Sequence, residues 1–579
     1  MNDISWLNAE ENARFFGPES GHLPLVLRRL SRARIVWINK QFAEHDPLFQ
    51  EAGAFGADYE QHILSSCAFV HNGDGEYDCA SFASDSVLGM VDRYGGPGIG
   101  LNGGSGRAAI VNGYLVKGIG RTPLVSSLTP ASHASGGAYL EETVRETIYA
   151  EIARAEFPGS AIPVLAIIDT GLTQVFHQAG ETKIERRTLL VRPSFIRPAH
   201  FYRAPFLRSL EERSGCADTA RVEKFSSTFV AQYGPETAVA TFEHLWCRWA
   251  QQLAYSFVHR LPHGSHTVSN ICLDGKLLDF GAMSSVPSWA NVATMLERQS
   301  FSAHERLIQG IMHSAKYYLE RYLGMSGQSP EYWFGLEQAI GVHFKSAIVQ
   351  ETLRLCGLSR AQCQGQGEST YRLIRRIFDH FQVEYLDIVE GKVHPQIEWD
   401  LSKVWNDCPP EHLAALQSLL KTLVSEDEWP AARAQCRLKS RTRSAISRVE
   451  LKEELFQALE GGRHPPETDR ERVEQLIMAK VSTSRRDHQL EAAGARLAGF
   501  AVNSDESLVL FQKLDDDVVF AVREPVMREN ANGVTLPPVP VHRLSGREII
   551  FANNARPAFI GAVSFFNEVT TSCPASASG

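Results

Sequence analysis

A glycine-rich stretch and the four polar residues that follow it constrain this sequence more than any other feature. Residues 94–107 hold seven glycines in fourteen positions. Two short apolar runs follow around Asn112-Gly113, a dipeptide that favours a tight hairpin turn. We therefore expect a strand, a glycine-rich turn and further strands, with Lys117 on the last of them.

Glu146, Asn270 and Asp279 follow in separate segments. Apolar residues four positions apart predict a helix over residues 141–157, which carries Glu146. A long buried helix is expected over residues 243–261, and the polar loop after it ends in Asn270. A hairpin then leads to Asp279, nine residues beyond Asn270.

Each of these residue types has a known use beside phosphates. Glycines let backbone N–H groups approach phosphate oxygens, because no Cβ lies in the way. A lysine paired with a helix glutamate stays charged, and Asn270 and Asp279 offer the hard oxygen ligands that Mg²⁺ prefers. Any one of these residues alone is more often a solvated loop, strand or helix position. The complete order is typical of a protein-kinase-like nucleotide site.

This order predicts an α+β fold class. We expect a bilobal protein-kinase-like fold with a mainly helical C-terminal lobe and an additional C-terminal α/β extension. We expect an extension of the N-terminal lobe over residues 1–90 and the nucleotide-binding lobe over residues 91–240. The helical lobe with the metal and catalytic loop is expected over residues 241–430, and an extension of unknown role over residues 431–579. A basic run over residues 437–448 is expected to be a solvated helix face, with a binding role as the alternative.

Composition excludes several classes of function. The chain has 58 Lys and Arg against 67 Asp and Glu, so its net charge of −9 does not predict nucleic-acid binding. No stretch approaches the roughly 18 apolar residues that a membrane helix needs, and the first residues lack the features of a secretory signal. Ten cysteines form no CxxC pair. We expect a cytoplasmic protein with no nucleic-acid or membrane partner.

At these residues the chain resembles the selenoprotein O family, the pseudokinase-fold protein adenylyltransferases, as a divergent member. The family motif KGxGRTP is similar to residues 117–123, KGIGRTP, and PSxIRxxHF is similar to residues 193–201, PSFIRPAHF. The family's glycine stretch is similar to residues 94–107. Its HGVMNTDN loop and DYG are similar to residues 263–270 and 279–281, HGSHTVSN and DFG.

The resemblance implies a mechanism and a set of site residues. In that family ATP binds in a flipped orientation, so AMP is transferred to a protein hydroxyl. The implied cofactor is Mg²⁺ or Mn²⁺ on Asn270 and Asp279, with ATP as substrate. The implied nucleotide contacts are Gly104, Gly106, Arg107, Lys117, Gly136, Arg197 and Asp279. Among them, Lys117 would be braced by Glu146, and Arg197 would contact the γ-phosphate. An ion pair between lobes is the alternative role of Arg197.

The chain departs from the family pattern around the phosphates. Leu190 stands where the family has a second arginine, and Arg192, two residues along the same strand face, is the candidate substitute. Ser135 replaces the acidic residue of the second glycine turn.

The general base is also replaced. Ser269 stands where the family has its proposed base, an aspartate, and Ser265 occupies the ordinary kinase base position. His266 is the nearest substitute, and a structural loop histidine is its alternative role.

The leading hypothesis is AMP transfer to a protein hydroxyl, or to a peptide or small-molecule group. A carboxylate acceptor needs no deprotonation, which suits a site without a base. A catalytically inactive ATP-binding scaffold and a phosphotransferase are the alternatives. Cys573 lies near the C-terminus, where bacterial family members have a redox-linked cysteine, and an idle tail cysteine is the alternative.

Overall fold

The computed structural model describes residues 4–544 of the chain with several gaps. The residues not described within that span are 21, 54–57, 74–76, 98, 130–133, 179–180, 208–214, 287–288, 290, 294–297, 300, 326, 384, 388–407, 427–431, 433–447, 460–468, 482–494, 503–505, 514–518 and 526–541. Cys573 and most of the basic run at 437–448 lie outside the described residues.

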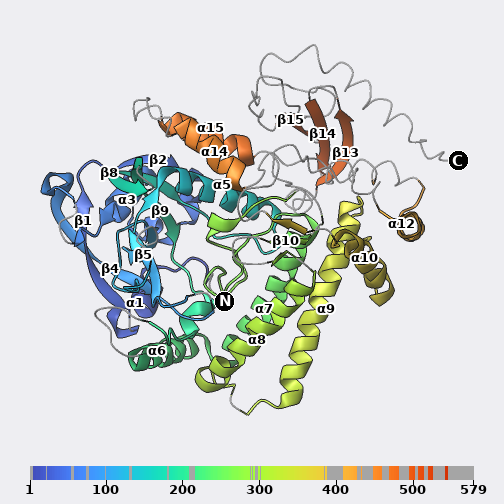
Figure 1. Ribbon diagram of the computed structural model, residues 1–579, viewed down its shortest axis with the longest axis horizontal. Helices are drawn as coiled ribbons and strands as arrows, with labels where there is room; N and C mark the ends of the chain where they lie inside the picture. Colours follow the sequence, from blue (N-terminus) through green and yellow to red (C-terminus); the bar gives the residue numbers. More distant parts are fainter. Residues whose placement is uncertain are drawn as a thin grey trace.

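A nine-stranded antiparallel sheet forms the N-terminal part of the molecule (Figure 1). Its strands follow the order β2-β8-β9-β6-β5-β4-β1-β3, and the short β7 also pairs with β9. The bounds are β1 Leu23–Leu30, β2 Arg34–Ile38, β3 Phe69–Val70, β4 Phe82–Arg93, β5 Gly104–Val111, β6 Tyr114–Lys117, β7 Ala138–Tyr139, β8 Ala166–Gln178 and β9 Glu181–Pro193. The first 70 residues thus supply both edges of the sheet.

The glycine-rich stretch connects β4 to β5, as the sequence predicts. The next connection, at Asn112 and Gly113, has φ angles of 48° and 87°. Two successive positive φ values define the hairpin turn that matches the twist of its strands, so the predicted strand–turn–strand ending in Lys117 is confirmed.

Adjacent apolar residues of the central strands face opposite sides of the sheet. Leu115 and Leu190 belong to the main hydrophobic core, together with helix α5 (Leu140–Glu156). Val116 and Val191 belong to a second core that includes buried residues of α3 (Tyr59–Cys67). Because both faces are covered, the position of Lys117 at the end of β6 is fixed from two sides.

Helices dominate the middle of the chain. Helix α7 packs against α8 and α9, and the three run side by side in Figure 1. Helix α7 begins at Pro235, earlier than expected, because proline favours the first helical turn. It therefore crosses the boundary expected near residue 240. The bounds are α6 Gly215–Tyr233, α7 Pro235–Val258, α8 Phe301–Tyr322, α9 Pro330–Leu355, α10 Glu368–Phe381 and α12 Pro410–Leu423.

Two helices of the expected C-terminal extension pack against α5. They are α14 (Arg448–Leu459) and α15 (Asp469–Val481), and α15 also contacts β2. Four strands follow as a separate antiparallel sheet, β13 Ala495–Val502, β14 Glu506–Lys513, β15 Val519–Pro525 and β16 His542–Leu544. The class α+β is therefore correct. Among the described residues, no helix is long and apolar enough to cross a membrane.

Candidate functional site

Lys117 lies at the centre of the candidate site. Its Nζ is 2.6 Å from Oε2 of Glu146 on α5 and 3.2 Å from Oδ1 of Asp279. Glu146 is fully buried, whereas the Asp279 side chain is 46% exposed. The charge of Lys117 holds the pKa of the Asp279 carboxyl well below its ordinary value. The expected pairing of Lys117 with Glu146 is confirmed.

Glu142 joins this cluster from the preceding turn of α5. Its carboxylate accepts two hydrogen bonds from the guanidinium of Arg107, at 3.0 and 2.6 Å, and lies 3.9 Å from Lys117. Burial alone would raise the pKa of Glu142, but the charges of Arg107 and Lys117 lower it to about 2. Glu142 therefore stays ionised at neutral pH and orients Arg107.

Arg192 lies on the far side of Glu146. It donates a 2.7 Å hydrogen bond to Oε1 of Glu146, so that carboxylate is bound between two cations. Leu190 pairs in register with Lys117 and is fully buried in the main core. Arg192 is thus close to the cluster but is engaged with Glu146.

Two of the predicted phosphate-binding glycines lie where no side chain fits. Gly136 has a φ of +71°, and a Cβ there would lie 1.9 Å from the backbone nitrogen of Arg121. Gly104 has a φ of +150°, and a Cβ there would lie 2.4 Å from the carbonyl oxygen of Asp92. Gly106 is less restricted, since its Cβ would meet only a Val125 methyl group, at 2.8 Å. The backbone approaches itself closely at the first two sites, which explains the glycines.

The loop after α7 orients the side chain of Asn270. Its Nδ2 donates to the carbonyl oxygen and the hydroxyl of Ser265, at 3.0 and 2.8 Å. This leaves Oδ1 for a ligand, beside the Ser269 hydroxyl, which donates to it at 3.3 Å. The N–H of Leu278 donates to the carbonyl of Asn270, so the segment ending in Asp279 lies against this loop. Amide and carboxylate oxygens are suitable ligands for Mg²⁺.

Asp279 has a left-handed backbone conformation, with φ 59° and ψ 72°. Such a conformation costs about 1 kcal/mol or more in a non-glycine residue and persists only when its surroundings hold it. The carbonyl oxygen of Gly281, two residues later, accepts hydrogen bonds from Arg145 of α5 and Arg448 of α14, at 2.9 and 2.6 Å. Phe280, which lies between Asp279 and Gly281 in the chain, is fully buried.

Arg197 belongs to a buried network. It donates to a carboxylate oxygen of Asp92 and to the carbonyl of Ser269, each at 2.7 Å, and is 5% exposed. Its guanidinium carbon lies 4.7 Å from the ring centre of Tyr94. The ion pair expected as the alternative to a phosphate contact was one between lobes, whereas the observed pair with Asp92 lies within residues 91–240. The hydrogen bond to Ser269 connects Arg197 to the loop of Asn270.

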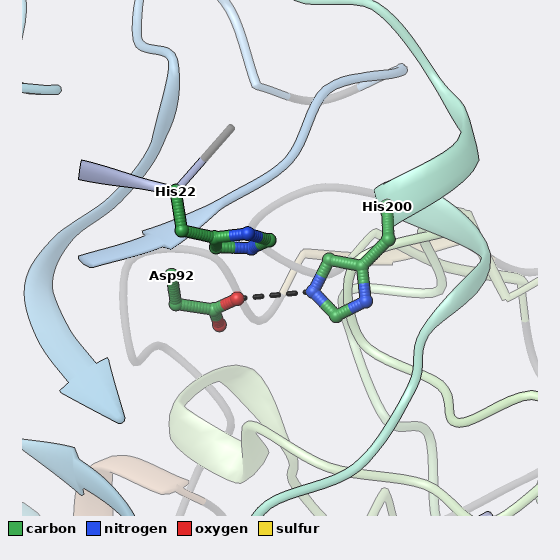
Figure 2. A group of neighbouring side chains, drawn as sticks. All are labelled: His22, Asp92 and His200. Carbon is green, nitrogen blue, oxygen red and sulfur yellow. Dashed lines mark hydrogen bonds and ion pairs between the residues drawn. The ribbon is translucent and has the colours of Figure 1, made fainter. Parts of the chain in front are cut away.

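Figure 2 shows His22 and His200 beside Asp92. In the described part of the chain, these three residues each offer an atom that could bind a metal ion, and the three atoms lie within 4.8 Å of one another. The N–H of Arg197 donates to Nδ1 of His200, so Nε2 carries the proton, which it donates to Asp92 at 3.0 Å. In this tautomer the lone pair of His200 lies on Nδ1, where it already accepts the Arg197 N–H and is not available to a metal ion. The group therefore fits a network that holds Arg197 better than a metal site.

His266, expected as a substitute base, has a buried side chain within the loop. It is 5% exposed, its ring lies 5.0 Å from that of His263, and burial lowers its pKa to about 3. An enclosed imidazole has no open path to an acceptor. Ser269, at the other expected position, donates its proton to Asn270 and accepts a 2.8 Å hydrogen bond from the Thr267 hydroxyl; a serine hydroxyl is not itself a base.

Three residues of the site were not predicted from the sequence. Glu142 had a usable signal, since it lies four residues before Glu146 and shares its helix face. Asp92 and Arg448 had none, because their partners are distant in the chain.

No protein-family model matches the chain, and no curated protein matches it.

Proposed function

We propose that this chain binds ATP with Mg²⁺ or Mn²⁺ in a bilobal protein-kinase-like fold and transfers AMP to an acceptor. The observation that carries the proposal is the contact of Lys117 with both Glu146 and Asp279. It supports a nucleotide site because a charged lysine and a metal-binding carboxylate must face the same phosphates.

The charges of the cluster suit a metal–triphosphate complex. Arg107, Lys117 and Arg192 balance the formal charges of Glu142, Glu146 and Asp279. A divalent cation on Asp279 and Asn270 would free Lys117 to turn from Asp279 toward phosphate oxygens. Gly104 and Gly136 would bring backbone N–H groups close to the same oxygens.

The resemblance to the adenylyltransferases supports transfer of AMP, and the loop chemistry supports an unusual acceptor. In the described loop of residues 263–270, serines occupy both expected base positions and His266 is enclosed. A carboxylate acceptor, on a protein, peptide or small molecule, is already ionised at neutral pH. It would attack the α-phosphorus and release pyrophosphate without a general base.

Two other functions remain as candidates. An ATP-binding scaffold without catalysis is favoured by the missing base. Transfer of the γ-phosphate is favoured by the ordinary kinase order of the residues. For the location we propose the cytoplasm, because the ten cysteines of the sequence are scattered and form no CxxC pair, which suits a reducing compartment.

The test uses ATP labelled at the α- or the γ-phosphate, with Mg²⁺, generic proteins and candidate carboxylates. Label from the α-position alone supports AMP transfer, label from the γ-position alone supports phosphotransfer, and ATP binding without transfer supports the scaffold. Asp279→Ala should abolish transfer and most Mg·ATP affinity, since the metal bridges protein and phosphates. Asp274→Ala is the matched control, because Asp274 pairs with Lys276 in the same hairpin.

A further inference from the structure

Helix α14 begins at the turn that carries Asp279. Its first residue, Arg448, donates from Nε to the carbonyl oxygen of Gly281 at 2.6 Å, and its backbone N–H donates to the hydroxyl of Ser284 at 3.0 Å. Two contacts from one residue thus join the C-terminal part of the chain to the segment just after Asp279.

The rest of α14 is anchored along α5. Leu451, Leu455 and Leu459 are buried at four-residue intervals and belong to the same hydrophobic core as Val144 and Ile148 of α5. A side chain mounted on such an anchored helix cannot move away without breaking this packing. Arg448 is therefore held at a fixed distance from α5, the helix that carries Glu146.

The carbonyl of Gly281 receives a second donor from α5 itself. Arg145 donates to it at 2.9 Å, while its Nε is held by Glu141 at 2.7 Å. Two guanidinium groups that donate to one carbonyl oxygen lie close together, and their like charges repel each other. The carboxylate of Glu141 lies near both arginines and reduces that repulsion.

These contacts act on a backbone that needs support. Asp279 has φ 59°, and the short helical turn after it, Phe280–Ala282, carries the shared carbonyl. We propose that Arg448 is a positioning residue for the metal-bound nucleotide: it holds the turn after Asp279 so that the carboxylate stays beside Lys117. The proposal rests on the proposed function, because it concerns the same metal and nucleotide.

The experiment measures ATP affinity by calorimetry on the full chain, with Mg²⁺ and with EDTA. Arg448→Ala should weaken Mg·ATP binding about tenfold, the effect of losing one hydrogen bond from a charged donor. Binding of ATP without metal should change less than about twofold, because in the nucleotide complex the metal, and not ATP itself, would contact the Asp279 carboxylate. Arg448→Lys should restore most of the affinity, since an ammonium can donate to the same carbonyl.

Arg472→Ala is the matched control. Arg472 donates to the carbonyl of Ala458, inside the same pair of helices and away from Asp279. It should leave both ATP affinities unchanged. Equal weakening with and without Mg²⁺ in Arg448→Ala, or the same Mg²⁺-dependent loss in Arg472→Ala, would overturn the proposal in favour of a merely structural role.

Amide hydrogen exchange at residues 280–284 provides a readout without nucleotide. Exchange there should rise in Arg448→Ala and not in Arg472→Ala, and an unchanged pattern would overturn the positioning role. If the wild-type chain binds no ATP under either condition, the proposed function fails. Exchange then decides alone whether Arg448 holds the turn.

Discussion

At the scale of single residues, the carboxylate of Glu146 is the most constrained group in the site. It is fully buried and bonds Lys117 with one oxygen and Arg192 with the other. A charge in such a place is stable only because both partners are present.

Replacing this carboxylate should be costly for folding. Glu146→Ala would leave Lys117 and Arg192 facing each other in the interior, so we expect the free energy of unfolding to fall by about 3–5 kcal/mol. Urea denaturation measures this change. Glu10→Ala, which breaks the exposed pair with Arg14, should cost less than about 1 kcal/mol. Similar losses in both variants would contradict the assigned role of Glu146.

Ser269 allows a test of the acceptor. If the chain modifies hydroxyl groups, Ser269→Asp should speed AMP transfer by about 10²-fold or more, since a positioned base contributes on that order. If the acceptor is a carboxylate, the same change should slow transfer, because a new negative charge beside Asn270 repels the incoming one. Rates with α-labelled ATP decide between the two. No change in rate would show that position 269 lies away from the reacting atoms.

At the scale of elements, the bounds of helix α5 could be predicted from the sequence, but its packing partners could not. Its bounds and its glutamate follow from apolar spacing, which is a local property. Its contacts with α14 and α15 depend on chain segments some 300 residues away, and no local pattern specifies them. The hairpin at Asn112 was predictable for the same reason as the helix, because two residues determine its turn.

The buried network around Arg197 shows the same limit. The sequence placed Arg197 near phosphates by resemblance, but its partner Asp92 is 105 residues away and is one of many aspartates. Strand order is needed to bring them together. Residues whose roles come from pairing across the fold are therefore found only once the fold is known.

The second glycine turn gives a prediction at this scale. Gly136→Ala should disrupt the connection between β6 and α5, because its Cβ would lie 1.9 Å from the Arg121 backbone. We expect a loss of at least about 2 kcal/mol in stability, measured by chemical denaturation. Gly100→Ala is the control, since nothing lies within 4 Å of a Cβ there, although its positive φ adds a small cost. Equal effects would contradict the close approach.

At the scale of the whole molecule, several buried histidines make stability depend on pH. Burial holds the pKa of His22 well below its ordinary value and lowers those of His200, His266 and His304 to about 4, 3 and 3. In the unfolded chain a histidine has a pKa of about 6.5. Below that pH the unfolded chain binds protons that the folded chain does not, so folding becomes less favourable.

Stability should therefore be greatest above pH 6.5 and fall as the pH decreases toward 4. Each histidine contributes up to about 1.4 kcal/mol per pH unit. Thermal melts between pH 7.5 and 5 measure the slope, and the window lies above the pH at which most carboxylates titrate. His304→Gln should reduce the slope of stability against pH by up to about 1.4 kcal/mol per pH unit, the contribution of one histidine. An unchanged slope would show that His304 has the same pKa in the folded and the unfolded chain.

The sheet order has a consequence for how the protein is made. Strand β2 pairs with β8, so Arg34 meets Asp169 only after 135 further residues have been synthesised. At about 5–20 residues per second, the ribosome takes roughly 7–27 s to produce them. During that interval the strand Arg34–Ile38 lies on the nascent chain without its partner strand β8, so both of its edges are unpaired. Slow synthesis over residues 40–165 would lengthen the exposure of this strand, and a chaperone that binds extended apolar segments would find its target there.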